Sequence, residues 1–265
     1  MPEPGDPPEV TPQLTPEAPP AYDLAVVAPA LNEAGNVGPL VAEITAAFAG
    51  TGRRVQVVIV DDGSTDATRQ QLNDLSQRHG YLQVIRHDTP QGQSASLHDG
   101  IAAAEAPLIA TLDADLQNDP ADLPAMLDLL HEKNVDLVQG DRSANRRDHA
   151  LRRGASLVGR LARRVIVGDT VRDTGCSTRV MRAEFARRLP LHRPGMHRFV
   201  PACVAGFGGR IIEVPVNHRP RREGRTKYGT GLLKRGLPGL RDCFAVRAMI
   251  RAARRADVNP TPASA

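Results

Sequence analysis

Short apolar runs alternate with amphipathic segments through the first half of the chain. Residues 24–29 form an apolar run, and the apolar positions that follow over 37–48 recur at the spacing of one helix face. The same alternation continues to residue 138 and predicts strands over 24–29, 55–60, 82–85, 107–112 and 135–138, with helices over 37–48, up to Arg78, over 93–104 and over 120–133. Alternating strands and helices predict an α/β fold with a mainly parallel, doubly wound sheet and helices on both faces.

The rest of the chain has a looser pattern. Residues 1–20 hold eight of the 22 prolines and four acidic residues but no basic one, so we predict a disordered tail over 1–21. The folded domain is expected over 22–228 and a basic helical segment over 229–256, with a flexible tail over 257–265. Between them, a basic helical region over 142–164 and a strand over 210–216 are predicted.

Length and composition narrow the class of protein. The 265 residues, 41% of them hydrophobic, are enough for one large core. No run approaches the 18 apolar residues of a spanning helix, and the N-terminus lacks a basic and an apolar stretch, so we predict neither a transmembrane helix nor a secretion signal. The three cysteines are widely spaced and favour reduced thiols in the cytosol over a disulfide framework or a zinc site.

The charge is segregated although its total is only +4. Residues 142–164 contain eight arginines and one acidic residue, and residues 219–255 contain twelve basic and two acidic residues. Such blocks indicate a polyanionic partner: nucleic acid, anionic lipid or a phosphorylated substrate. A solvated face in an arginine-rich proteome is the alternative.

Polar clusters follow three of the predicted strands. They are Asn32-Glu33, Asp61-Asp62 and Asp113-Ala114-Asp115. In a parallel sheet these clusters meet at the carboxyl edge, where ligands bind. Two carboxylates one residue apart suit a hard cation such as Mg²⁺ or Mn²⁺, and a site with so few protein ligands implies that a nucleoside diphosphate completes the coordination.

The acidic clusters also have simpler interpretations. An isolated pair of aspartates is usually a solvated turn or a cap, and Asp119 before Pro120 is predicted to be a helix cap. The position of Asp113 after a buried apolar strand favours the functional interpretation. No glycine-rich phosphate loop follows the first strand, which argues against a dinucleotide dehydrogenase and a P-loop kinase.

In their order along the chain, the motifs at 29–33, 60–66, 113–117 and 221–228 resemble those of the family 2 nucleotide-sugar glycosyltransferases of the GT-A fold. Within that family they are similar to the polyprenyl-phosphate branch, which includes dolichyl-phosphate mannose synthase. The resemblance covers about residues 24–230. It implies a metal-dependent hexosyltransferase that moves a sugar from a GDP- or UDP-hexose to a polyprenyl phosphate, dolichyl or undecaprenyl, with inversion at the anomeric carbon.

The resemblance also assigns residues. The nucleotide sugar would be bound by Pro29, Asn32, Glu33, Asp61, Asp62, Asp113, Ala114 and Gln117. The Mg²⁺ or Mn²⁺ ion would be held by Asp113, Asp115 and Gln117, and the catalytic group would comprise Asp115, Arg221, Lys227 and Asp173. Arg221 and Lys227 would clamp phosphates, with Thr226 in place of the family's usual serine. The segment at 118–120 departs from the His-Pro-Pro-Glu of many relatives, which affects capping more than chemistry.

Two roles stay open at this point. Asp173, in the acceptor-like loop 172–177, either orients the acceptor or acts as its base, or it stabilises a turn. The segment 229–255 is either a helix on an anionic membrane surface or a helix packed on the domain, with a break or kink expected at Pro238-Gly239. Relatives of this kind often carry hydrophobic C-terminal helices, whereas a polar tail follows residues 254–255 in this sequence. We therefore expect any membrane attachment to be peripheral, at the cytoplasmic, inner face.

Three alternatives to the main hypothesis remain. A saccharide acceptor would make Asp173 an essential base. A non-enzymatic protein that binds anionic lipid or nucleic acid would leave the acidic motifs unexplained, and the aromatic content of 3% argues against binding nucleic acid by stacking. A sugar-phosphate nucleotidyltransferase would need a glycine-rich first loop. We therefore expect no nucleic-acid partner; the sequence leaves open the donor base, the sugar, the metal and the oligomeric state.

Overall fold

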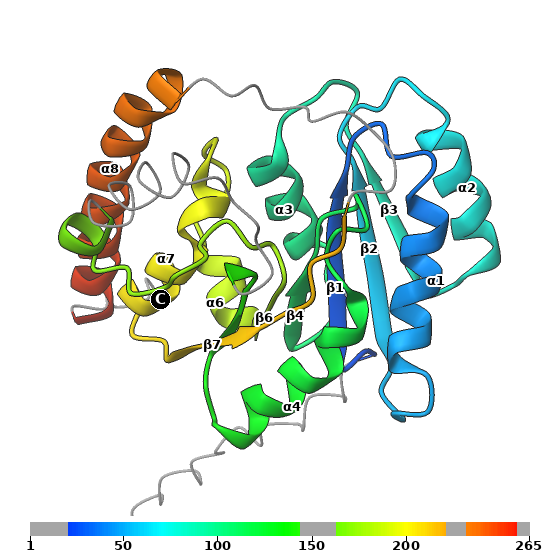
Figure 1. Ribbon diagram of the computed structural model, residues 1–265, viewed down its shortest axis with the longest axis horizontal. Helices are drawn as coiled ribbons and strands as arrows, with labels where there is room; N and C mark the ends of the chain where they lie inside the picture. Colours follow the sequence, from blue (N-terminus) through cyan, green and yellow to red (C-terminus); the bar gives the residue numbers. More distant parts are fainter. Residues whose placement is uncertain (1–20, 144–162, 221–231, 259–265) are drawn as a thin grey trace, which may run out of the picture.

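The computed structural model describes residues 21–143, 163–220 and 232–258, and over the last stretch it describes side chains for 241–255 (Figure 1). The strands are β1 (Leu24–Ala30), β2 (Val55–Asp61), β3 (Leu82–Arg86), β4 (Leu108–Thr111), β5 (Leu137–Asp141), β6 (Arg179–Arg182) and β7 (Ile211–Pro215). The helices are α1 (Val37–Phe48), α2 (Thr68–Arg78), α3 (Gln93–Ala102), α4 (Leu123–Glu132), α6 (Ala183–Arg188), α7 (Val200–Gly206) and α8 (Leu232–Val258), with 3-10 turns at Pro120–Asp122 and Met196–Phe199.

The seven strands form a single sheet in the order β3-β2-β1-β4-β6-β5-β7. The first four strands in this order, β3, β2, β1 and β4, are parallel to one another, as predicted, and β7 runs parallel to β5. Between these groups, β6 pairs antiparallel with both β4 and β5. The mainly parallel α/β sheet matches the sequence pattern, whereas β6 had not been predicted.

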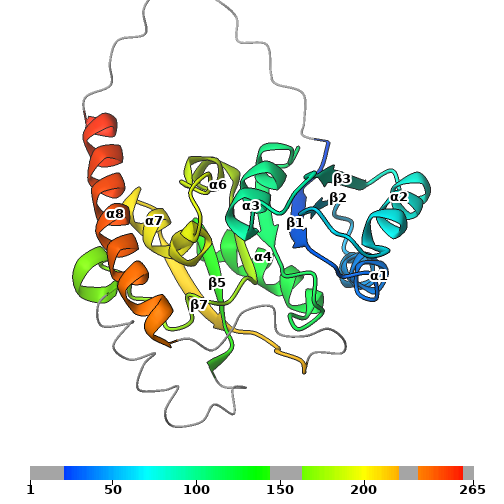
Figure 2. The same ribbon diagram turned by 90° about the horizontal axis from the view of Figure 1, so that it is seen from above.

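Two hydrophobic cores cover the two faces of the sheet. Alternate residues of β1 point to opposite sides: Leu24 and Val26 pack into the core with α1 and α4, and Ala25 and Val27 pack into the core with α3, α6 and α7. Figure 2, turned by 90°, separates α1 and α2 from α3 and α6. The strands are therefore buried on both faces, which explains their nearly continuous apolar sequences.

Helix α8 packs on α7 with one of its faces. For that face, the prediction of a helix packed on the domain is confirmed. Cys243, Val246 and Ile250 are buried in the second core. Ile250 lies so close to Gly206 that a Cβ on that glycine would meet its Cγ1 at 2.6 Å, and Arg254 Nε donates to the Gly206 carbonyl at 2.7 Å. The helix continues through Pro238, so a break there was wrong, because a proline removes one helical hydrogen bond without necessarily ending the helix. The kink, which was the other expectation at Pro238-Gly239, stays a prediction.

Several predictions lie outside the described residues: the N-terminal tail up to residue 20, most of the basic region 142–164, the 221–228 motif with Arg221 and Lys227, and the C-terminal tail from residue 259. The flexible tail was predicted from residue 257, whereas α8 continues to Val258. Within the part of the chain that the structure describes, no helix is both long enough and apolar enough to cross a bilayer.

Candidate active site

The loops after β1 and β2 are joined to each other at the carboxyl edge of the sheet. Asn32 takes a positive φ of 52°, which its short amide side chain tolerates. Its N–H donates to Ser64 Oγ at 2.9 Å, and its Oδ1 accepts from the Thr65 N–H at 2.8 Å. The Glu33 N–H donates to Thr68 Oγ1 at 2.8 Å. The predicted residues Asn32 and Glu33 thus lie beside the second cluster, next to Pro29 at the end of β1.

Asp61 and Asp62 are both buried, and their carboxylates hold this edge together. Asp61 accepts from the Ser64 N–H at 3.0 Å. Asp62 accepts from the N–H groups of Gln91 at 2.7 Å and Gly92 at 2.9 Å, and contacts the His87 ring. Both aspartates therefore have a structural role, and their contacts with a nucleoside stay predictions.

The loop that begins with Asp113 follows β4. Gln93 Nε2, from the start of α3, donates to Asp113 Oδ1 at 2.8 Å. The Gln117 N–H donates to Asp115 Oδ1 at 3.2 Å, and Leu116 between them has a φ of 59°, which is uncommon for a side chain of this kind. The loop is therefore bent so that Asp113 and Asp115 lie close enough for their charges to interact.

The electrostatics of this pair suit a cation. Burial raises the pKa of Asp113, and the negative charge of Asp115 raises it further. No cluster of three or more His, Cys, Asp or Glu side chains in the described residues forms a metal site, so a metal here would have few protein ligands. A divalent cation would relieve the repulsion between the two carboxylates, and Mg²⁺ or Mn²⁺ would take its remaining oxygen ligands from a diphosphate. Gln117 Nε2 donates to the Arg219 carbonyl at 3.5 Å, and the role of Gln117 as a ligand stays a prediction, as does that of Ala114 beside the diphosphate.

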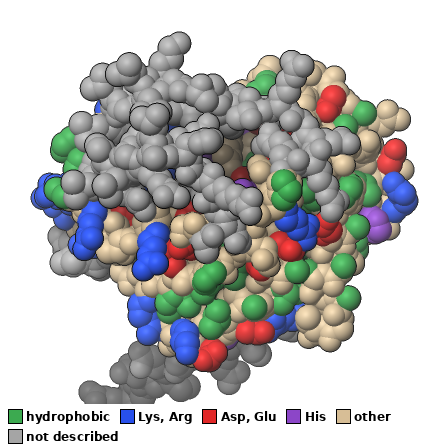
Figure 3. All heavy atoms as spheres, in the orientation of Figure 1, with side chains coloured by type: hydrophobic (Ala, Val, Ile, Leu, Met, Phe, Trp, Pro, Cys, Tyr) green, Lys and Arg blue, Asp and Glu red, His purple; other side chains and the backbone are tan. Residues whose placement is uncertain are grey.

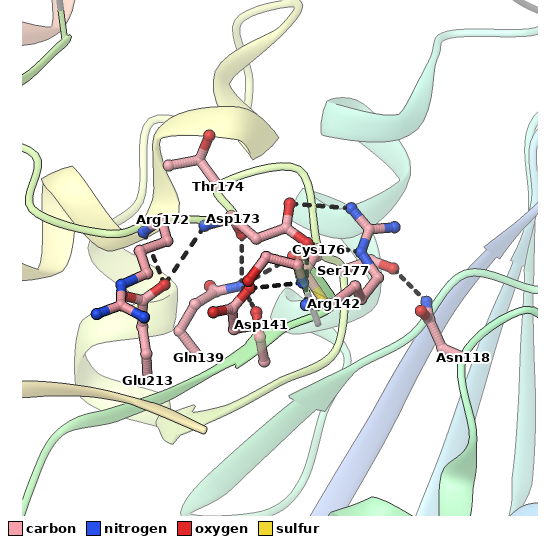
Figure 4. A network of polar contacts seen from close by, with 12 residues as sticks. Asn118, Gln139, Asp141, Arg142, Arg172, Asp173, Thr174, Cys176, Ser177 and Glu213 are labelled. Carbon is pink, nitrogen blue, oxygen red and sulfur yellow. Dashed lines mark hydrogen bonds and ion pairs between the residues drawn. The ribbon is translucent and has the colours of Figure 1, made fainter. Parts of the chain in front are cut away.

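Asp173 forms an ion pair with Arg142 (Figure 4). Arg142 donates from Nε to Asp173 Oδ2 at 2.8 Å and from Nη2 to Oδ1 at 3.1 Å, and its backbone N–H donates to Oδ2 at 3.2 Å. The loop is fixed further because Glu213 accepts from the Arg172 N–H at 2.7 Å. Asp173 is thus placed to orient Arg142, a residue to which the sequence motifs had assigned no role.

A second arginine, Arg179 of β6, lies wholly inside the protein. Its Nε donates to Gln139 Oε1 at 2.8 Å and its Nη2 to the Thr174 carbonyl at 3.2 Å. Burial lowers its pKa, while nearby anionic groups, including Asp113, act in the opposite direction. Arg142 and Arg179 therefore place positive charge beside Asp113, and neither had a signal in the sequence beyond its basic character.

Ser94 and His197 also meet beside this site, although they are far apart in sequence. Ser94 Oγ lies 2.8 Å from His197 Nδ1 and accepts from the His197 N–H at 3.1 Å. Burial and the charges of Arg198 and Arg179 lower the pKa of His197 to about 3. His197 is therefore a neutral ring at physiological pH.

The chain just before residue 221 runs along the Asp113 loop. The Arg219 N–H donates to the Gln117 carbonyl at 2.7 Å, and its guanidinium pairs with Glu43 and Asp119, each at 2.6 Å. The predicted cap is confirmed, because Asp119 Oδ1 accepts from the Ala121 N–H at 3.0 Å. The described chain therefore reaches residue 219 beside the loop of the candidate metal site.

Comparisons with known proteins identify the family. The model of the family "Glycosyl transferase family 2" matches residues 25–189, from the second residue of β1 to beyond β6, a stretch that contains all three polar clusters at the strand ends. This chain is a member of glycosyltransferase family 2. The resemblance seen in the sequence is confirmed.

Relatives within the family act on polyprenyl phosphates. The chain is 40% identical over 218 residues to the dodecaprenyl-phosphate galacturonate synthase of Rhizobium johnstonii, covering 79% of this chain and 62% of that protein. It is 33% identical over 208 residues to the undecaprenyl-phosphate 4-deoxy-4-formamido-L-arabinose transferase of Edwardsiella ictaluri, covering 78% of this chain and 63% of the relative. The chain thus spans less than two thirds of the length of these relatives.

A solved structure establishes the fold. Glucosyl-3-phosphoglycerate synthase from Mycobacterium tuberculosis, crystallised with Mn²⁺, UDP and glucosyl-3-phosphoglycerate, superposes with a TM-score of 0.61 at 19% identity, covering 87% of this chain and 80% of that chain. The GT-A fold predicted for this family 2 member is confirmed.

Proposed function

We propose that this protein is an inverting glycosyltransferase that transfers a sugar from a nucleoside diphosphate sugar to a polyprenyl phosphate. The observation that carries the proposal is the Asp113-Ala114-Asp115 loop at the end of β4, tied through Gln93 to the α3 start and so to the first two loops. The names of two relatives at 33–40% identity support the lipid acceptor. The sugar moved by one of them is an acid, so uronic acid donors belong among those to be tested beside GDP- and UDP-hexoses.

On the donor side, the first two loops would line the nucleoside pocket, and the third would lie at the diphosphate. A Mg²⁺ or Mn²⁺ ion held by Asp113 and Asp115 would supply positive charge to the leaving diphosphate. The guanidinium groups of Arg142 and Arg179 lie close enough to Asp113, in the same loop, for their positive charges to act on it. Arg221 and Lys227 would add two more cations at the phosphates.

The ion pair of Asp173 favours a phosphate acceptor over a saccharide acceptor. A sugar hydroxyl needs a base to take its proton, whereas a polyprenyl phosphate oxygen is already anionic at neutral pH. Asp173 is buried and engaged by Arg142 through both of its oxygens. Its role is then to hold Arg142 towards the anionic groups of the site instead of removing a proton.

The exposed face of α8 supports contact with an anionic membrane surface at the cytoplasmic side. Phe244 is 56% exposed and lies on one stripe with Arg241, Arg247 and Arg251. Val165 is 71% exposed beside Arg164, and the two residues that follow it, Ile166 and Val167, pack against the same core as α8. In the space-filling view, Lys and Arg side chains are visible on the side of the molecule that carries α8 (Figure 3). An aromatic side chain among arginines is typical of helices that lie at a lipid interface.

The experiment is transfer of radiolabelled sugar into an organic-extractable product. The purified full chain is mixed with undecaprenyl phosphate, Mg²⁺ or Mn²⁺, and UDP-glucose, UDP-galacturonate or GDP-mannose in turn. We expect labelled lipid with one donor, lost on chelation and in Asp115→Ala, but retained in the matched control Asp74→Ala on the exposed surface of α2. Label that passes only to added saccharides, and never to the lipid, would instead support the saccharide acceptor. If the chain bound none of these donors, the enzyme assignment would fail.

A further inference from the structure

His87 lies at the end of β3, buried between two carboxylates. Its Nδ1 is 2.8 Å from Asp62 Oδ1, and its Nε2 is 3.0 Å from Asp99 Oδ2. A neutral imidazole has one N–H and can donate to only one of them, whereas the imidazolium donates to both. The geometry of this bridge therefore suits a protonated ring.

The bridge continues to the candidate active site through Asp62. The same carboxylate accepts from the N–H groups of Gln91 and Gly92, which lead directly into α3. The first residue of α3 is Gln93, whose side chain donates to Asp113. His87 thus fixes the carboxylate that holds the start of α3, and the start of α3 contacts the candidate metal loop.

The charges around His87 favour its protonated form. Burial opposes the charged ring, but hydrogen bonds and charge from Asp62 and Asp99 outweigh it, and the pKa of His87 is raised above 6.5. The groups that face it are Asp61 and Asp62 at the end of β2, Asp99 and His98 on α3, and Arg69 on α2, whose Nη2 donates to the His87 carbonyl at 3.2 Å. The acidic groups outnumber the basic ones.

We infer that His87 is a positioning residue for donor binding, and that its imidazolium holds Asp62 and the α3 start in the conformation that receives the nucleoside diphosphate. This inference rests on the proposed function, because it requires that the site bind such a donor. Loss of the His87 proton then frees one carboxylate, and donor affinity falls as the pH rises through the pKa of His87. The effect has the sign expected for a raised histidine pKa: it is fully present at low pH and lost at high pH.

The test measures binding of UDP and of GDP, each with Mg²⁺, to the full chain by titration calorimetry between pH 6 and 9. In the wild type we expect affinity to fall about tenfold across this range, the equivalent of one hydrogen bond to a charged group. In His87→Gln we expect weaker binding with that pH dependence removed, while the exposed-surface control His131→Gln keeps it. Comparing the profiles cancels the titration of the nucleotide itself.

A second variant keeps the test decisive if His87→Gln is unstable. Asp99→Asn preserves an acceptor for Nε2 but removes one of the two flanking charges, so the midpoint of the affinity profile, and the His87 pKa measured by NMR, should move to lower pH. Equal pH profiles in wild type and His87→Gln, or an unmoved midpoint in Asp99→Asn, would refute the role of His87 even though the donor binds. Failure of the wild type to bind either nucleotide at any pH would refute the proposed function itself, and this role with it.

Discussion

The ion pair between Arg142 and Asp173 gives a prediction whose size can be worked out from the structure. The two side chains are only 12% and 6% exposed, and three hydrogen bonds join the residues. Asp173→Ala leaves a guanidinium largely out of water without its counter-charge, a change that typically costs about 3–5 kcal/mol. Since domains of this kind are stable by about 5–15 kcal/mol, this loss is a large fraction of the total.

Urea unfolding followed by circular dichroism measures the effect. The free energy of unfolding of Asp173→Ala should fall by about 3–5 kcal/mol, and the double variant with Arg142→Met should lose less than the sum of the two single losses, because the pair is removed together. A wild-type free energy of unfolding in Asp173→Ala, with sugar transfer abolished, would refute this reasoning. That result would make Asp173 a base and revive the saccharide acceptor.

Three further predictions concern other parts of the molecule. A Cβ on Gly100 of α3 would overlap with Val27 Cγ1, so Gly100→Ala should lower the free energy of unfolding by about 1–2 kcal/mol despite its better helix propensity. Gly38→Ala on α1, where nothing lies within 4 Å, should cost nothing, and equal melting temperatures for the two variants would contradict this. All three cysteines are buried and burial raises the pKa of Cys203 to about 12, so Ellman's reagent should label no thiol at pH 8 before unfolding; rapid labelling of the native chain would count against it. Phe244→Ser should weaken binding to anionic vesicles several-fold in a sedimentation assay, and unchanged binding would exclude the exposed stripe of α8 as the membrane contact.

The sequence was sufficient for the parallel part of the fold. The apolar strands and their helices have strong periodic signals, and the three acidic clusters lie along one edge because parallel strands all end there. β6 could not be predicted, since it begins and ends with arginine and a charged residue is expected at the surface. Arg179 is only 3% exposed because Gln139 and Thr174, on other segments, satisfy its donors.

The sequence also could not predict which residues contact each other in the candidate active site. The motifs located the loops, but the partners of Asp62 are the N–H groups of Gln91 and Gly92 just before α3, and the partner of Asp113 is Gln93, the first residue of α3. No motif indicated these contacts. Ser94 and His197 are separated by 103 positions, and only the fold brings them together. Helix α8 packs with one face on α7, where Gly206 has no side chain and so allows Ile250 to come close. Hydrophobic periodicity alone does not reveal this contact.

The antiparallel strand β6 has a consequence for the order in which the chain can fold. β4 can pair with β1 as soon as it is made, because β1 precedes it in the chain, but the partner of its other edge, β6, is synthesised about 70 residues later. Until then the nascent protein presents an unpaired apolar strand edge, the kind of surface that captures other chains. Fragments that end before residue 182, the last residue of β6, should therefore aggregate. A ribosome that pauses before this residue would prolong the time during which the β4 edge is exposed.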